Sequence, residues 1–231
     1  MKALVMFLLF GCTLLSAQSA DSTLVFTSPE PETFPERRSQ MDDAWGVDIL
    51  LSNNGFGLAG FYRHQYSRDL FGTVNFGLAE SKDDNEVEQY YYPGYSFILG
   101  KLNRFLVLPL HFGVQYRLFA DDITDSFRPY VNAGIGPTMI LVHPYMDQST
   151  GEQIEYFSSL GKAQPRYTVG GYIGAGAFFG ADMGSLSGIN IRYYFIPMSG
   201  GIDSRINEFG RRERKTEFGG FFITINIGSA F

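Results

Sequence analysis

The feature that most constrains this chain is an alternation of apolar side chains with small or polar ones at every second residue. It is present in Glu217–Phe231, which has the sequence EFGGFFITINIGSAF. The opposite face of this stretch, from Phe222 to Ala230, is small or polar in character. A period of two is that of a β-strand whose two faces meet different surroundings. The almost wholly apolar face comprises Phe221, Ile223, Ile225, Ile227, Ser229 and Phe231.

The same pattern recurs along the chain and predicts eight strands. Turn-forming residues separate them, as in Asn53-Asn54-Gly55. Most of the segments have roughly the 9–11 residues that a tilted strand needs to cross a bilayer. The predicted strands are Ala44–Ser52, Phe56–Tyr66, Leu70–Glu80, Phe105–Phe119, Phe127–Val142, Arg166–Gly180, Leu186–Pro197 and the final stretch Glu217–Phe231.

The connections between the predicted strands differ regularly in length. Those after the second, fourth and sixth strands are short, and those after the third, fifth and seventh are long. Outer-membrane barrels have short periplasmic turns and long extracellular loops, and an even strand number leaves both ends in the periplasm. We therefore expect an all-β fold, an eight-stranded antiparallel transmembrane β-barrel over residues 44–231.

The composition fits a membrane barrel and argues against other classes. Hydrophobic residues make up 45% of the chain and charged residues 18%, and there are 27 glycines. Beyond the first twenty residues, no apolar run reaches the roughly 18 residues of a transmembrane helix. The net charge of −6 argues against a nucleic-acid partner, because nucleic-acid-binding surfaces are basic.

The N-terminus has the pattern of an export signal. The apolar stretch Ala3–Phe10 follows a positive residue and precedes small residues, with cleavage expected after Ala17 or Ser19. Residues 1–17 are therefore predicted to be a signal peptide. Residues 18–43, which contain three prolines, are predicted to be an extended periplasmic tail.

Cys12 is the one cysteine of the chain and ends a loose lipobox, LFGC. Lipidation of Cys12 is therefore the alternative to cleavage further along. After that later cleavage, the mature protein has no cysteine for a disulfide or for thiol chemistry.

The second face of the predicted strands is polar and is expected to turn away from hydrocarbon. An arginine near the bilayer midplane costs roughly 2–4 kcal/mol on the lipid face. The interior of an eight-stranded barrel is only wide enough for its own side chains, which predicts a packed polar network and not a pore. The expected members are Asp48, Arg63, Gln65, Asn75, His111, Gln115, Arg117, Arg128, Asn132, Asn190, Arg192, Thr224 and Asn226.

Three of these side chains, Arg63, Arg117 and Arg128, lie close to the predicted periplasmic turns. Buried charges need partners, so we expect ion pairs that close the periplasmic end. A vestibule that binds anions is the functional alternative. The acidic residues of the turns are Asp69, Asp121, Asp122 and Asp125.

The stretch Glu217–Phe231 resembles the C-terminal signal of bacterial outer-membrane barrels, in which alternate apolar residues precede a final aromatic one. The resemblance covers this strand closely and the other strands as a pattern. It implies a small porin-like protein in the outer membrane of Gram-negative bacteria, in contact with outer-membrane lipid and lipopolysaccharide. It also implies that the barrel-assembly machinery recognises Phe231.

Motifs for catalysis or metal binding are sparse. His64 and Ser67 resemble the His and Ser of outer-membrane lipid A deacylases, but two residues separate them here where that family has one. His111 is expected to belong to the polar network, because a metal site would need two or three further ligands. We predict no catalytic residue, no cofactor and no metal. An enzyme that modifies lipid A remains an alternative function.

The long connections carry opposite charges. The segment 81–92 is acidic and rich in tyrosine, whereas the segment 198–216 is basic. Basic side chains can bind lipopolysaccharide phosphates or an acidic partner. We therefore predict a non-enzymatic protein that is structural or binds a ligand or a protein partner, at the surface or in the periplasm. A narrow solute channel is a further alternative. The candidate loop contacts are Arg211, Arg212, Arg214 and Lys215.

Overall fold

The computed structural model describes residues 43–53, 55–83, 86, 88–91, 95–120, 123, 126–147, 150–180 and 184–231. The predicted signal peptide, Cys12 and all but the last residue of the predicted tail lie outside the described residues. So do Asp121, Asp122 and Asp125 of the second short turn.

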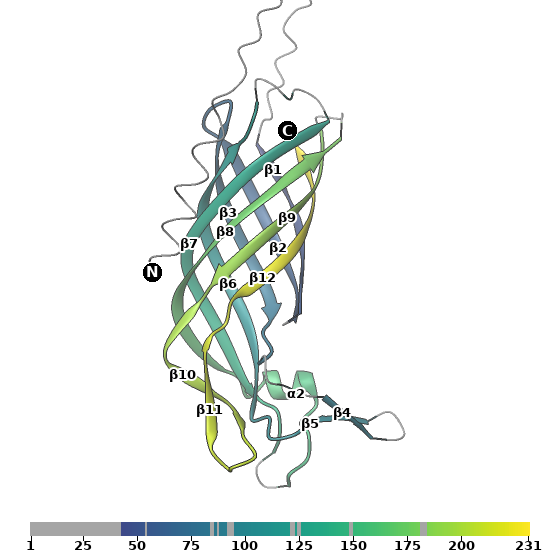
Figure 1. Cartoon of the computed structure of the whole chain (residues 1–231), viewed down its shortest axis with the longest axis vertical. Coiled ribbons are helices and arrows are strands. Elements are labelled where there is room, and N and C mark those ends of the chain that lie inside the picture. Colours follow the sequence, from purple (N-terminus) through teal and green to yellow (C-terminus); the bar gives the residue numbers. More distant parts are fainter. Residues whose placement is uncertain are drawn as a thin grey trace, which may run out of the picture. The chain divides into compact units, whose positions relative to one another are not determined.

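Eight strands form one closed antiparallel barrel (Figure 1). Around the barrel their order is β1-β12-β9-β8-β7-β6-β3-β2, and β2 pairs again with β1. The fold class predicted from the sequence is confirmed, and the strand bounds differ from the predicted ones by no more than three residues. The barrel strands are β1 (Ala44–Ser52), β2 (Gly55–Gln65), β3 (Leu70–Glu80), β6 (Asn103–Arg117), β7 (Phe127–Pro144), β8 (Gln164–Phe179), β9 (Ser185–Phe195) and β12 (Gly220–Ala230).

The barrel is closed by the pairing of β1 with β12. Their register runs from Ala44 opposite Ala230 to Leu51 opposite Ile223. Closure leaves no barrel strand with an unpaired edge, which is the condition for placing a sheet in hydrocarbon. Phe231 follows β12 on the outer surface and is 66% exposed. Its role in assembly stays a prediction.

The two faces of the strands separate an apolar outer surface from a polar interior. On the outer face, Ile135, Val169 and Ile191 are 65%, 59% and 57% exposed. On the inner face, Asp48 and Asn190 are fully buried. A water-soluble fold would bury the first set and expose the second, so this surface has the apolar character that a transmembrane barrel presents to lipid.

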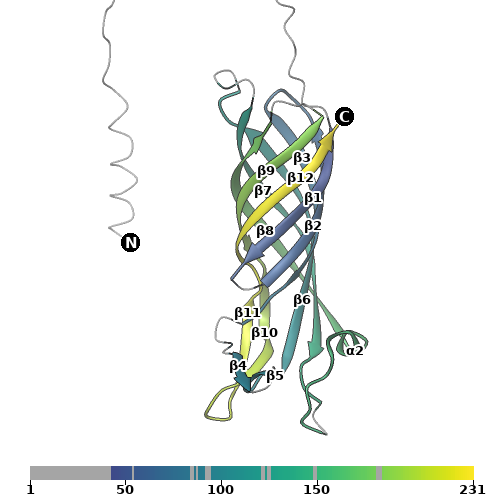
Figure 2. The same ribbon diagram turned by 90° about the vertical axis from the view of Figure 1, so that its right-hand side faces the viewer.

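The two ends of the barrel differ in their connections (Figures 1 and 2). At one end, here called the turn end, short segments join β2 to β3, β6 to β7 and β8 to β9. The other end, the loop end, carries the hairpin β4–β5 (Glu88–Tyr91 and Tyr95–Ile98), the helix α2 (Tyr156–Leu160) and the hairpin β10–β11 (Pro197–Ile206 and Arg212–Glu217). No helix among the described residues is long and apolar enough to cross a membrane.

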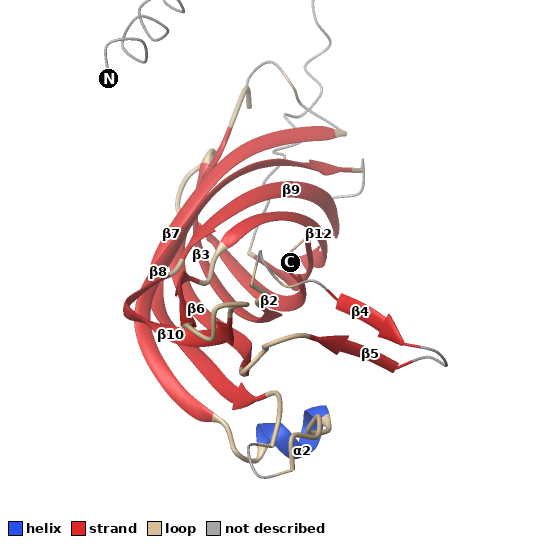
Figure 3. Cartoon of the chain, turned by 60° about the horizontal axis from the view of Figure 1, so that its bottom comes forward, coloured by secondary structure: helices blue, strands red, loops and turns tan. Residues whose placement is uncertain are grey.

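These hairpins and the helix lie in segments that the sequence analysis assigned to loops. Figure 3 shows β4–β5 and α2 beside the barrel rim. β10 follows β9 after Ile196, and ion pairs join it to β11, with 2.6 Å between Arg205 Nε and Glu213 Oε2. Cross-strand charge pairs stabilise this hairpin, and apolar periodicity alone does not detect such pairs.

The barrel interior has an apolar cluster toward each end of its polar centre. Phe222 was expected on a small or polar face, and the larger cluster was not predicted from the sequence, because no strand contributes more than two of its members. We call this larger cluster, toward the loop end, the plug; it contains Leu50, Ala59, Phe105, Val107, Ile140, Tyr172, Tyr194, Ile196, Phe218 and Phe222. The smaller cluster, toward the turn end, contains Ala44, Phe71, Tyr130, Phe178 and Leu186.

Gly176 on β8 tests how tightly the interior is filled. A Cβ added there would lie 2.5 Å from the Ile189 carbonyl oxygen and 2.8 Å from Asn190 Cα. We therefore expect Gly176→Ala to lower the free energy of unfolding by about 1–3 kcal/mol. Urea titration of the protein folded in vesicles, read by the different gel mobility of boiled and unboiled samples, measures this.

Gly60→Ala is the matched control. Gly60 faces outward, and an added Cβ would meet only the Gly46 carbonyl oxygen, at 3.9 Å. Its free energy of unfolding should stay within about 0.5 kcal/mol of the wild-type value. Equal stability of the two variants would contradict a filled interior.

Candidate functional site

Nine of the side chains predicted for the polar network, the ones that bear most on the site, are buried in the barrel. None of them is more than 7% exposed. They do not form one continuous network, but fall into groups at the centre of the lumen and toward the turn end. The nine are Asp48, Arg63, Asn75, His111, Gln115, Arg117, Arg128, Asn132 and Arg192.

An ion pair between Asp48 and Arg192 lies in the centre of the lumen. Arg192 Nη1 donates to Asp48 Oδ2 at 2.8 Å, and Asn226 Nδ2 donates to the other carboxylate oxygen. The Tyr130 hydroxyl donates to Asn226 Oδ1 at 3.2 Å and accepts from Asn190 Nδ2 at 3.1 Å. These contacts join β1, β7, β9 and β12 across the lumen. Both oxygens of the buried carboxylate therefore have partners, as a charge removed from water requires.

A second group of polar side chains lies next to the plug. Asn75 Nδ2 donates to the Tyr172 hydroxyl at 2.9 Å. His111 Nε2 lies 3.2 Å from Thr138 Oγ1, and the ring of His111 lies 5.7 Å from that of Tyr172 and 6.0 Å from that of Tyr194. His111 thus has polar and aromatic partners inside the lumen.

Arg117 and Arg128 bind backbone carbonyl groups at the turn end. Arg117 Nη2 donates to the Ile123 carbonyl oxygen at 3.1 Å, and Arg128 Nη2 donates to that of Gly180 at 3.3 Å. Arg117 and Arg128 therefore hold the turns to the barrel through the backbone. Nearer the middle of the barrel, Gln115 and Asn132 lie opposite each other on β6 and β7.

Arg63 lies between two aromatic rings of the turn-end cluster. Its guanidinium carbon is 4.8 Å from the ring centroids of both Phe71 and Phe178. Its three side-chain nitrogens have no hydrogen-bond partner among the described residues. The ion pair predicted between Arg63 and an acidic turn residue is thus not formed with any described carboxylate, and cation–π contacts take its place.

Side chains fill most of the space inside the barrel. One cavity, between the plug and the polar centre, measures about 30 Å³, and another, between the polar centre and the turn-end cluster, measures about 10 Å³. A buried water needs roughly 10–15 Å³ on this measure, so these cavities have room for one or two waters. A solute molecule does not fit in either of them.

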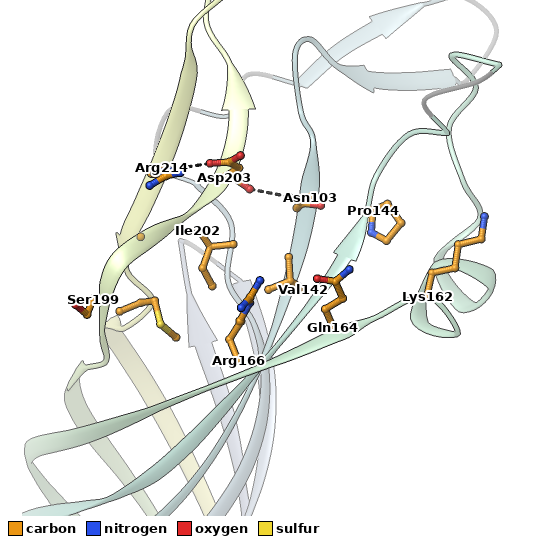
Figure 4. Close-up of a pocket in the computed structure, with 12 residues that line it drawn as sticks. Asn103, Val142, Pro144, Lys162, Gln164, Arg166, Ser199, Ile202, Asp203 and Arg214 are labelled. Carbon is orange, nitrogen blue, oxygen red and sulfur yellow. Dashed lines mark hydrogen bonds and ion pairs between the residues drawn. The ribbon is translucent and has the colours of Figure 1, made fainter.

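The loop end, in contrast, carries a cleft of about 630 Å³ (Figure 4). One wall is formed by the ends of β6, β7 and β8, and the other by β10 and β11. Val142, Met198 and Ile202 line it on the barrel side, where they pack against the plug. Its main polar lining residues are Asn103, Lys162, Gln164, Arg166, Asp203 and Arg214.

Asp203 is already bound to two arginines of the same hairpin. Arg212 Nη1 lies 3.1 Å from Asp203 Oδ2, and Arg214 Nε lies 3.0 Å from Oδ1. Hydrogen bonds from Arg212 and Arg214 hold the pKa of the Asp203 carboxyl below its usual value of 3.8. Figure 4 shows Asp203 between Arg214 and Asn103, whose Nδ2 donates to the Asp203 backbone oxygen at 2.7 Å.

Arg166 projects into the cleft from β8 (Figure 4). It is exposed, and no hydrogen bond or ion pair joins it to a described residue. Arg166 was not among the residues predicted from the sequence, although a signal was present. Arg166 is an even number of residues from Gly170 and Tyr172, which face the lumen, so the inward face of β8 continues past the barrel rim.

A second cavity, of about 710 Å³, adjoins the cleft and shares Asn103, Pro144, Lys162 and Asp203 with its lining. Lys162 lies at the border, with Nζ 4.0 Å from Asp147 Oδ2. The loop end therefore carries two adjoining cavities.

The four basic residues predicted as loop contacts do not form one patch. Arg214 lines the cleft and Arg212 lines the adjoining cavity. Lys215 Nζ donates to a backbone carbonyl oxygen of the connection after β3, at 2.7 Å. Arg211 is exposed and belongs to neither lining.

His64 and Ser67 have separate partners at the turn end. His64 Nδ1 lies 2.8 Å from Asp43 Oδ1, and Ser67 Oγ accepts a hydrogen bond from the Leu70 amide at 3.2 Å. The structure therefore does not bring them together as a catalytic pair. No group of three or more His, Cys, Asp or Glu side chains in the described part of the chain could hold a metal ion.

His143 and Ser159 form a pair that the sequence analysis missed. His143 Nδ1 lies 2.8 Å from Ser159 Oγ, but the serine hydroxyl donates to the Tyr156 carbonyl oxygen at 2.7 Å. Both residues are 0% exposed. A nucleophilic serine needs a base to take its proton, and a substrate must reach it. This pair instead fastens α2 to β7.

No protein-family model and no curated protein matches the sequence. Among solved structures, the N-terminal β-barrel domain of Pseudomonas aeruginosa OprF is similar at 11% identity and a TM-score of 0.41, with 83% of this chain and 98% of that chain covered. The outer membrane protein OprG of the same species is similar at 11% identity and a TM-score of 0.44, with 82% of this chain and 94% of that chain covered. Neisserial surface protein A (NspA) is similar at 11% identity and a TM-score of 0.41, with 81% of this chain and 92% of that chain covered. The proteins that this chain resembles are thus small outer-membrane β-barrels.

Asp48→Asn should destabilise the barrel strongly. The change leaves Arg192 buried without its charged partner, which costs about 3–5 kcal/mol. The fluorescence of Trp45, the one tryptophan of the chain, reports unfolding by urea in vesicles. The double variant Asp48→Asn/Arg192→Met should recover much of the loss. A double variant no more stable than the single one would contradict this account of the pair.

The hairpin β10–β11 should loosen in acid. A carboxyl group whose folded pKa is depressed contributes stability above its unfolded pKa, and that stability is lost as the pH falls through the folded pKa. We therefore expect hydrogen-exchange protection factors in β10–β11 to stay constant down to about pH 4 and to fall below it.

Asp203→Asn separates the contribution of Asp203 to the stability of the hairpin from that of Glu213. The pKa of Glu213 is also lowered, by a hydrogen bond from Arg205. The variant should show weaker protection at neutral pH and a smaller loss in acid. The same acid profile in variant and wild type would show that Asp203 does not hold the hairpin.

Proposed function

We propose that this chain is a non-enzymatic β-barrel of the bacterial outer membrane that binds a ligand or partner at its loop end, outside the cell. The apolar outer surface supports a lipid environment, because hydrocarbon is the surrounding in which such a face is stable. The long connections at one end support the orientation, because outer-membrane barrels carry their long loops on the extracellular side.

The contrast between the cavities supports binding over transport. Cavities inside the barrel measure about 10 and 30 Å³, whereas those at the loop end measure about 630 and 710 Å³. Ligand sites in proteins occupy roughly 300–1,000 Å³. A channel also needs a continuous water path, and the plug and the Asp48–Arg192 pair obstruct one.

Two single-cysteine variants test the location and orientation. Ser199 lines the cleft at the loop end and Ser67 lies at the turn end, and both are exposed. On intact cells a membrane-impermeant maleimide should label Ser199→Cys and leave Ser67→Cys unlabelled until the outer membrane is permeabilised. The opposite labelling order would overturn the orientation, and recovery of both variants in the soluble fraction would overturn the location.

The alternatives are separated by two further measurements. Purified protein in planar bilayers should give no stepwise conductance, because the interior is filled. Lipid A from expressing cells should keep its mass. Conductance steps would favour a channel, and a mass change would favour a lipid A-modifying enzyme.

A further inference from the structure

We infer that the 630 Å³ cleft is a site for a small organic anion that carries an apolar group, with its acidic head on Arg166 and its apolar part on Val142, Met198 and Ile202. The inference rests on the proposed function and specifies its ligand.

The charges of the cleft favour an anion. Its lining holds three cations, Lys162, Arg166 and Arg214, against one carboxylate, Asp203. That carboxylate is occupied by Arg212 and Arg214, so it does not neutralise Arg166. The lining of the cleft therefore carries a net positive charge.

Arg166 is the group best placed to hold an acidic head. It is exposed in the cleft and has no hydrogen bond or ion pair with a described residue. A guanidinium presents a planar fork of N–H donors that fits the two oxygens of a carboxylate or phosphate. Gln164 and Asn103 add amide groups to the same lining.

The floor of the cleft is apolar and supported from beneath. Val142, Met198 and Ile202 pack against the plug, so the surface they present is backed by buried aromatic rings. Below them, the Thr168 hydroxyl donates to the Pro197 carbonyl oxygen and ties β8 to the start of β10. An apolar group placed on this floor would be removed from water, which favours binding. Inorganic anions have no apolar group and do not gain this contribution.

The size of the cleft sets the scale of the ligand. A volume of about 630 Å³ suits a compact molecule. A protein surface or a lipopolysaccharide layer would instead contact the exposed tip of β10–β11, where Arg211 lies outside the cleft. Arg211 therefore serves as a matched control for Arg166.

The test uses the full barrel in phosphatidylcholine nanodiscs, with empty nanodiscs subtracted, and isothermal titration calorimetry. Two probes carry both features, 1-naphthyl phosphate and 1-naphthoate. Two carry one each, 1-naphthol and inorganic phosphate. At least one of the first pair should bind saturably at one site, about tenfold or more tightly than either of the second pair, because a charge-assisted contact and apolar burial then act together.

Arg166→Gln should weaken binding of that probe by about tenfold or more, and Arg211→Gln should leave it unchanged. Both residues are exposed, and gel mobility of unboiled samples confirms that both variants are folded. Ile202→Ser should weaken the same probe and bring its affinity closer to that of inorganic phosphate.

Three results would overturn the inference: no saturable binding of either naphthyl acid, equal effects of Arg166→Gln and Arg211→Gln, or inorganic phosphate binding as tightly as both naphthyl acids. None of them bears on the labelling of Ser199→Cys or on conductance. A failed titration together with the expected labelling would therefore reject this ligand class and leave the proposed function in place.

Discussion

The hydrogen-bonded seam between β1 and β12 is the contact on which the rest of the structure depends. In hydrocarbon, an unpaired backbone N–H or C=O group costs several kcal/mol, so a sheet there has to be closed. Pairing from Ala44–Ala230 to Leu51–Ile223 removes the last two edges. Because side chains alternate along every strand, closure also assigns each of them to lipid or to the lumen. The apolar outside and the polar inside are therefore two consequences of one seam.

The charged side chains buried in the lumen are stabilised by two different kinds of contact. Asp48 and Arg192 neutralise each other, and Asn226 and Tyr194 supply further hydrogen bonds. Arg63 has two aromatic rings and no described carboxylate. The plug then separates this polar centre from the loop end.

The loop end owes its cleft to strands of unequal length. β6, β7 and β8 have 15, 18 and 16 residues, whereas β1 has 9. The longer strands carry their inward faces past the rim, and β10–β11 stands opposite them. Side chains such as Arg166 keep the inward direction of a lumen residue, but β10–β11 lies across the cleft from them and no hydrogen bond or ion pair joins Arg166 to a described residue. Such positions can face a ligand, because the barrel itself does not need them.

The sequence by itself determined the eight strands, their faces and the unequal connections. A period of two is visible in the local sequence, and only the apolar face of such a strand can be exposed to hydrocarbon. The sequence also identified Asp48, Arg192 and the other polar lumen residues as a set. Which of them pair was decided only by the tertiary structure, since strand register places Arg192 beside Asp48 and Arg63 between Phe71 and Phe178. The plug, the charge-paired hairpin and the cleft at Arg166 were likewise beyond the sequence pattern. They arise where single residues from separate strands meet, and that meeting depends on how the closed barrel brings distant segments together.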